Sequence, residues 1–312
     1  MHARPRARRP LGRAVFKPPR ALGVITGGAL AAWAFVLALI SLSIAVGAPA
    51  EFKTFVAWLL AAALLLLAIT FGYWAYCLWT LSYTVERTAL AIRWGLRTVL
   101  IPIDSIQRMV PGRTLELGRV KGITWWGCHI GQATIPRIGQ TLVFSTHSAA
   151  DEILYLLTGT NTYALTILDQ ASFAEEIQAR AAMGPVVGHA QTSTVRGLAS
   201  FGFLHDRALL AGIGVGVVLC SVLVGYVFSQ YPGMADIVQL HFPALGGVAR
   251  VGSKSEVLRI AYLGAGVLAV NAALAAFAHG RERAAGMWLI ASGGMFQAIL
   301  LAAAVVAISR TT

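Results

Sequence analysis

The most prominent pattern in the sequence is a set of five long apolar stretches, each long enough to cross a bilayer as a helix. Crossing a hydrocarbon core of about 30 Å takes about 20 helical residues. The stretches cover residues 21–48, 55–81, 208–228, 257–278 and 286–308. The only Asp, Glu, Lys or Arg inside them is Arg259, which lies near a helix end, from where its side chain can extend to the head groups. The pattern therefore predicts five transmembrane helices.

The distribution of Lys and Arg predicts how these helices are oriented, because bases gather on the cytoplasmic side of membrane proteins. Residues 1–20 contain seven Arg or Lys residues and no acidic residue. The turn between the fourth and fifth stretches contains Arg281 and Arg283. We therefore expect a multi-pass protein of the cell (plasma) membrane, with the N-terminus in the cytoplasm and the C-terminus outside.

Residues 82–184 have a different pattern, in which apolar residues alternate with polar or small ones. Leu90, Ile92 and Trp94, for example, would lie on one face of a strand. Several short runs of this kind, separated by Gly- and Pro-containing turns, predict a small β-sandwich or barrel. The segment ends in Ser172-Phe173-Ala174-Glu175, which predicts a helix with Ser172 as N-cap and Glu175 completing a capping box.

Parts of this segment resemble the bacterial PH-like domain family. Residues 83–95 contain a Tyr-bearing strand, a short turn and an apolar strand that ends in Gly95, and Ile101-Pro102-Ile103 follows. Residues 160–168 and the pair Ser172-Phe173 match the closing part of the family pattern. The resemblance implies a barrel of the pleckstrin-homology superfold. The expected fold class is therefore membrane α-helical, with five transmembrane helices, plus an all-β PH-like barrel capped by one C-terminal helix.

These features divide the chain into five parts. We expect a basic cytoplasmic N-terminus (1–20), a two-helix membrane hairpin (21–81), the cytoplasmic PH-like domain (82–184), a linker (185–207) and a three-helix membrane domain (208–308) with an outer loop at 230–256.

The outer loop is similar to a short uncharacterised domain of bacterial membrane proteins, including toxin-immunity proteins. The similarity consists of a Pro near the membrane, an apolar residue followed by His241-Phe242, a Gly turn, and a base before Gly-Ser-Lys. His241, Arg250 and Lys254 are candidate contact residues, since two bases on the outer side oppose the usual charge bias. Alternatively, Arg250 and Lys254 extend to outer head groups and His241 packs at the membrane surface.

Composition limits the class of function. The chain of 312 residues is 57% hydrophobic and 12% charged, against about 25% charged residues in soluble domains. The formal net charge of +12 could suggest nucleic acid, but the bases lie mainly at predicted membrane boundaries, so no nucleic-acid partner is expected. The lipid bilayer is the expected partner, together with an unidentified protein in the membrane or envelope. Anionic head groups are a further candidate partner for the bases at positions 108, 113, 119, 121 and 137, although a solvated basic face explains them more simply.

The sequence contains no recognisable catalytic or metal-binding motif. The three cysteines and seven histidines lack metal-ligand spacing, and Cys128-His129 would point to opposite faces of a strand. Asn271 and Gln297 are expected to form hydrogen bonds between helices. Trp125 and Trp126 could enter the membrane interface. The simpler expectation is that one of them fills the core and the other shields a strand edge.

The expected protein is therefore not an enzyme and has no cofactor. It is a non-catalytic multi-pass membrane protein with a cytoplasmic PH-like binding or scaffolding domain, and a relation to the envelope is a further expectation. The alternative is a small transporter or channel-like protein in which the PH-like domain is regulatory.

The orientation can be tested by thiol labelling. A cysteine introduced at residues 244–249 should react with a membrane-impermeant thiol reagent in intact cells, whereas one introduced near Gly159 should react only after lysis. The parent protein, which has three cysteines, is the control. Labelling of the second position together with protection of the first would overturn the orientation.

Overall fold

The computed structural model describes residues 12–115, 118–147, 149–184, 192–195, 202–239 and 251–309. The chain forms two compact units. Residues 1–33 and 67–197 make up one of them, here called the β-rich unit, and residues 34–66 and 198–312 make up the other, here called the helical unit.

Five helices are long and apolar enough to cross a membrane, as the sequence pattern predicts. They are α1 (Ala21–Ala45), α2 (Phe52–Trp79), α4 (Arg207–Gln230), α5 (Leu258–His279) and α6 (Arg283–Ser309). The first part of α1 and the last part of α2 belong to the β-rich unit, and the remainder of both helices belongs to the helical unit.

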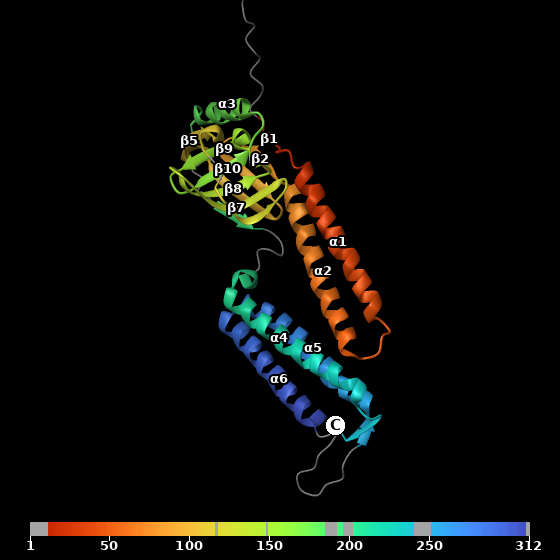
Figure 1. The fold of residues 1–312 in the computed structure, drawn as a ribbon. Helices are drawn as coiled ribbons and strands as arrows, with labels where there is room; N and C mark the ends of the chain where they lie inside the picture. Colours follow the sequence, from red (N-terminus) through yellow and green to blue (C-terminus); the bar gives the residue numbers. More distant parts are fainter. Residues whose placement is uncertain are drawn as a thin grey trace, which may run out of the picture. The chain divides into compact units, whose positions relative to one another are not determined.

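The β-rich unit contains two sheets and the helix α3 (Gln170–Ala181), which Figure 1 shows across one end of the sheets. The first sheet has the strand order β1-β2-β3-β4-β11, with β1 (Ala14–Phe16), β2 (Ser82–Val85), β3 (Ala89–Trp94), β4 (Arg97–Pro102) and β11 (Thr192–Val195). The second has the order β5-β9-β10-β8-β7-β6, with β5 (Ile106–Pro111), β6 (Lys121–Trp125), β7 (Cys128–Ile135), β8 (Gly139–Ser145), β9 (Ile153–Thr158) and β10 (Thr162–Thr166). All neighbours are antiparallel except β8 and β10.

The two sheets bury one shared hydrophobic core. It combines Leu90 and Ile101 of the first sheet with Leu156 and Leu165 of the second, and Phe173 of α3 closes it. Tyr83 is fully buried and donates a hydrogen bond from its hydroxyl to the carbonyl of Phe144, at 2.6 Å, which joins the sheets. Among the described residues, the paired strands form two separate sheets, so the PH-like arrangement of sheets and terminal helix is present without a closed barrel.

Both outer strands of the first sheet come from outside residues 82–184, where sequence periodicity placed the domain. Strand β1 precedes the first membrane helix and pairs with β2, and β11 pairs with β4. Arg13 forms an ion pair with Glu86 at 2.5 Å, and the rings of Phe16 and Phe173 meet edge to face. Strands β1 and β11 have three and four residues, which is too short to give a periodic signal, so only the pairing shows that they belong to the sheet.

Helix α3 begins earlier than the predicted capping box. Its N-cap is Asp169, whose carboxylate accepts a hydrogen bond from the backbone N–H of Ser172 at 3.0 Å, so the assignment of Ser172 as N-cap was wrong. Hydrogen bonds from the side chain and the backbone of Ser172 lower the pKa of the Asp169 carboxyl group. The amide of Gln170, the first residue of the helix, donates to the carbonyl of Asp151 at 3.0 Å and ties the start of α3 to the chain that enters β9.

In the helical unit, α4, α5 and α6 pack through small residues and one buried amide. The side chain of Gln297 is fully buried and donates to the carbonyl of Gly264 at 2.6 Å, as expected for an interhelical hydrogen bond. At the start of α4, Asp206 caps the helix and accepts hydrogen bonds from Arg283 of α6. This arrangement lowers the pKa of Asp206 to about 2.

The Tyr83 hydrogen bond predicts a difference between two buried tyrosines. Tyr83→Phe should lower the free energy of unfolding of the β-rich unit by about 1–3 kcal/mol, because the Phe144 carbonyl loses its partner in a buried site. Tyr155→Phe is the matched control, since the Tyr155 hydroxyl is buried with no hydrogen-bond partner among the described residues. Protease resistance of the full-length protein as a function of denaturant measures both, and equal effects would contradict the assignment.

The Asp206–Arg283 pair predicts an acid-sensitive contribution to the stability of the helical unit. The pKa of Asp206 in the folded protein is below its ordinary value of 3.8, so the pair stabilises fully above about pH 4 and loses its contribution as the pH falls through about 2. Thermal unfolding in detergent should therefore show a gap between the parent protein and Asp206→Asn at pH 5 that closes near pH 2. Asn keeps the N-cap, and a gap independent of pH would exclude the ion pair as its cause.

Candidate functional site

A hollow of the β-rich unit with a polar edge forms a groove between strand β5 and helix α3. Its volume is about 640 Å³. Strand β5 is an outer strand of the second sheet, and among the described residues its second edge carries no paired strand. The groove therefore runs along backbone N–H and C=O groups that a further extended chain could pair with.

Helix α3 presents small side chains to this groove. Ala171 and Ala174 lie about one turn apart on the groove side of the helix, and Ala181 lies about two turns further on. Phe173 and Ile177 fill the core beside them. Because an alanine extends only one carbon from the backbone, this side of α3 leaves room between the helix and the strand.

The floor of the groove is apolar and its rim is polar. The floor is made by Ile103, Ile106, Met109 and Leu154, and the rim by Gln107, Arg108, Gln170 and Gln178. Arg108 is exposed, and no ion pair is recorded for it in the part of the chain that the structure describes. A groove of this kind accepts alternating apolar side chains, and its one base favours an acidic group.

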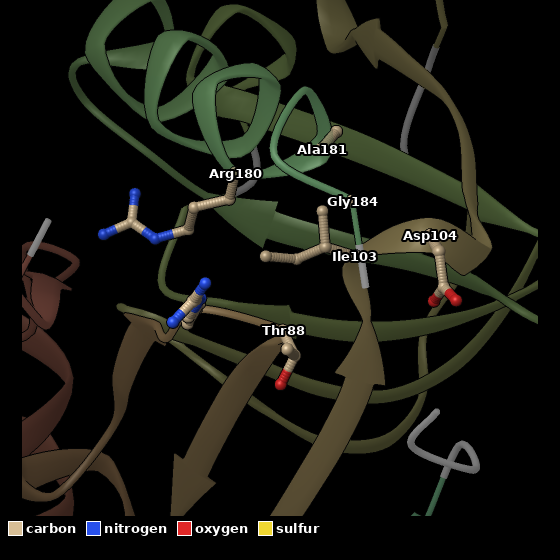
Figure 2. Close-up of a pocket in the computed structure, with 7 residues that line it drawn as sticks. Thr88, Ile103, Asp104, Arg180, Ala181 and Gly184 are labelled. Carbon is tan, nitrogen blue, oxygen red and sulfur yellow. The ribbon is translucent and has the colours of Figure 1, made fainter. Parts of the chain in front are cut away.

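A smaller pocket of about 60 Å³ lies at the C-terminal end of α3, beside the β2–β3 turn. Figure 2 shows Arg180 and Asp104 on opposite sides of this pocket. The Arg180 side chain is buried and bonds to the Glu176 carboxylate and to the carbonyl of Gly12. It therefore ties the end of α3 to the chain that enters β1, which is a structural role.

The structure places one of the three candidate contact residues of the outer loop. Lys254 forms an ion pair with Asp236 at 2.9 Å, and this pair lowers the pKa of Asp236. The pairing holds the hairpin of β12 (Ile237–Gln239) and β13 (Val251–Ser253), which accounts for Lys254 without a ligand. His241 and Arg250 lie outside the described residues, so their role as contacts stays a prediction.

The bases that are close in sequence do not form one patch. Arg108 lies on β5 and Lys121 on β6, which are the two opposite edges of the second sheet. Arg137 lies in the β7–β8 turn, where its φ is +72°. Sequence proximity therefore overstated the basic face, and Arg108 is the base that lines the groove.

Cys128 has the environment of a core residue, whereas its neighbour His129 is only half-buried. Cys128 is buried, and burial raises the pKa of its thiol to about 12, so the thiol stays protonated at neutral pH. Burial, with a smaller effect of His147, lowers the pKa of His129. Among the described residues no group of three or more His, Cys, Asp and Glu side chains could hold a metal ion.

Two sheets around one core, closed by a terminal helix and joined to five long apolar helices, define a membrane protein with a domain of the pleckstrin-homology type. The comparison with protein families agrees, because residues 81–181 match the family described as Bacterial PH domain. Comparisons with curated proteins and with solved structures gave no match. The chain is thus a membrane protein that carries a bacterial PH domain.

The residues of the groove were not identified as a site from the sequence. Ala171, Ala174 and Ala181 line the groove, but alanines in a helical sequence do not by themselves distinguish a groove-lining face from a packed one. That β5 is an outer strand depends on the pairing of distant strands, and no local pattern encodes it.

Proposed function

We propose that this protein is a non-catalytic membrane scaffold whose PH domain binds an extended segment of a partner protein in the groove between β5 and α3. The observation that carries the proposal is the open edge of β5 facing a groove of about 640 Å³. Strand addition at a sheet edge supplies affinity through backbone hydrogen bonds and specificity through the alternate side chains.

The groove indicates the chemistry of the partner segment. Its apolar floor suits side chains at every second position, and Arg108 on the rim suits a carboxylate. The partner segment is therefore extended, alternately apolar and acidic. The charge bias of residues 1–20 supports a location of the PH domain in the cytoplasm, so the partner is a cytoplasmic protein or the cytoplasmic part of a membrane protein.

The polar residue buried in the helical unit supports a scaffold more than a transporter. A transport pathway generally contains ionisable residues or interrupted helices near the middle of the bilayer. Gln297 instead uses its amide N–H to bond the backbone of α5, and α4, α5 and α6 are continuous helices.

A binding experiment with a defined probe tests the groove. The full-length protein in nanodiscs is panned against a displayed library of ten-residue peptides, and an enriched peptide is synthesised. We expect enriched peptides to alternate apolar residues and to contain Asp or Glu. Ala174→Trp should weaken binding at least tenfold, because the larger side chain fills the groove.

Ala179→Trp is the matched control, since Ala179 is an exposed alanine of the same helix that does not line the groove. Arg108→Glu should reverse the preference for acidic peptides, while Arg113→Glu, outside the groove, should leave it unchanged. Equal loss of binding in Ala174→Trp and Ala179→Trp, or enrichment of no peptide, would refute the groove as the binding site.

A further inference from the structure

The tip of the β6–β7 hairpin is fixed against the first turns of α1. The indole N–H of Trp125 donates to the carbonyl of Gly23 at 3.0 Å. The backbones of Gly23 and Gly127 approach so closely that a Cβ on Gly23 would lie 2.2 Å from the Gly127 carbonyl oxygen. Gly127 also has a φ of +81°, a backbone conformation that glycine adopts without the steric cost of a Cβ. Glycine at both positions thus allows the hairpin to touch the helix directly.

Trp125 extends this contact to α2. Its ring stacks on Trp74 at 5.8 Å and meets Phe71 edge to face at 6.3 Å. Gly27 of α1 lies against the same ring, with its Cβ position 3.2 Å from the indole. The hairpin tip is therefore held by both helices, so its distance from the membrane is set by the contacts and not by a flexible loop.

The contacts with the hairpin tip lie in the first two turns of α1 and the last three turns of α2, near the helix ends that join the sheet. At 1.5 Å per residue, α1 with 25 residues and α2 with 28 residues are about 37 and 42 Å long, against about 30 Å of hydrocarbon. Both helices therefore extend several Å beyond the hydrocarbon. Gly23 and Gly27 lie in the first two turns of α1, directly after Arg20, whose guanidinium lies over the Trp79 ring at the end of α2.

Trp126 follows Trp125 at the hairpin tip and is 80% exposed. Trp125 is partly buried and packs against the hydrophobic core of the sheets, whereas Trp126 is not part of that core. The expectation that the second tryptophan shields a strand edge stays a prediction. An indole combines a large apolar surface with one N–H donor, which is why tryptophans concentrate where hydrocarbon gives way to head groups. A position beside the first turns of a membrane-spanning helix is one where such a side chain can reach lipid head groups.

We propose that the β6–β7 hairpin is a membrane-interface anchor, in which Trp126 inserts among the lipid head groups beside the start of α1. The PH domain then contacts the bilayer surface directly, in addition to its two covalent connections to α1 and α2. This surface is distinct from the β5–α3 groove, because β6 and β5 are opposite edges of the second sheet.

Depth-dependent fluorescence quenching tests the proposal. Single cysteines at Trp126, Thr124 and Gly159 are labelled with an environment-sensitive dye in the full-length protein, in nanodiscs that contain lipids with a spin label on the head group. Thr124 is exposed on the same hairpin, and Gly159 is exposed at the β9–β10 turn. We expect strong quenching at 126, less at 124 and none at 159.

Protein without an added cysteine controls for labelling of the three buried native thiols. Because Trp126 is exposed and lies outside the hydrophobic core, Trp126→Cys should fold, and a normal gel-filtration profile confirms this. Quenching at 126 no greater than at 159 would overturn the anchor. If the 126 variant is not monodisperse, the comparison of 124 with 159 decides, since an anchored hairpin requires quenching at 124 and a solvated one excludes it.

Discussion

The structure of the β-rich unit depends on the short connections between the membrane helices α1 and α2 and the paired strands β1 and β2. Four residues separate β1 from α1, and two residues separate α2 from β2. Because β1 and β2 are hydrogen-bonded neighbours, the helices that follow and precede them must leave the sheet side by side. The Thr80 hydroxyl at this junction accepts a hydrogen bond from the N–H of Gly95 at 2.8 Å, and Arg20 bonds to the carbonyl of Leu81. No flexible linker separates the sheet from the helices here.

This junction explains why the PH domain uses residues that precede the first membrane helix. A sheet edge that faced water would expose unpaired backbone groups and invite association. In the first sheet, β1 covers the edge of β2 and β11 covers the edge of β4. The Phe16 ring against Phe173 and the Arg180 bond to Gly12 fasten this first segment to α3 as well. Folding of the domain and placement of the first helix are therefore coupled.

The second sheet differs in that its β5 edge faces a groove rather than a strand. The groove exists because α3 is anchored by Phe173 and Ile177 in the core while its neighbouring face contains alanines. At the opposite edge, β6 and β7 turn toward α1 and end in the exposed Trp126. One domain thus has two surfaces of different chemistry: an apolar groove with one base, suited to an extended chain, and an aromatic tip suited to the bilayer.

The sequence by itself determined the five membrane helices, because hydrophobic length is a local property that the bilayer selects directly. It also determined the bacterial PH domain, since strand alternation and the closing helix are local patterns. The N-cap was misplaced by three residues because Asp169 and Ser172 both suit a cap, and only the folded chain shows that the Asp169 carboxylate accepts the cap hydrogen bond.

Tertiary structure alone decided the rest. Whether Trp125 lies in the core or against α2, whether Arg108 and Lys121 share a surface, and whether β5 has a free edge all depend on residues far apart in the chain. Periodicity assigns a side chain to a face, but it does not identify what covers that face. The candidate site and the membrane anchor are both properties of uncovered surface, and for that reason they became visible only in the folded molecule.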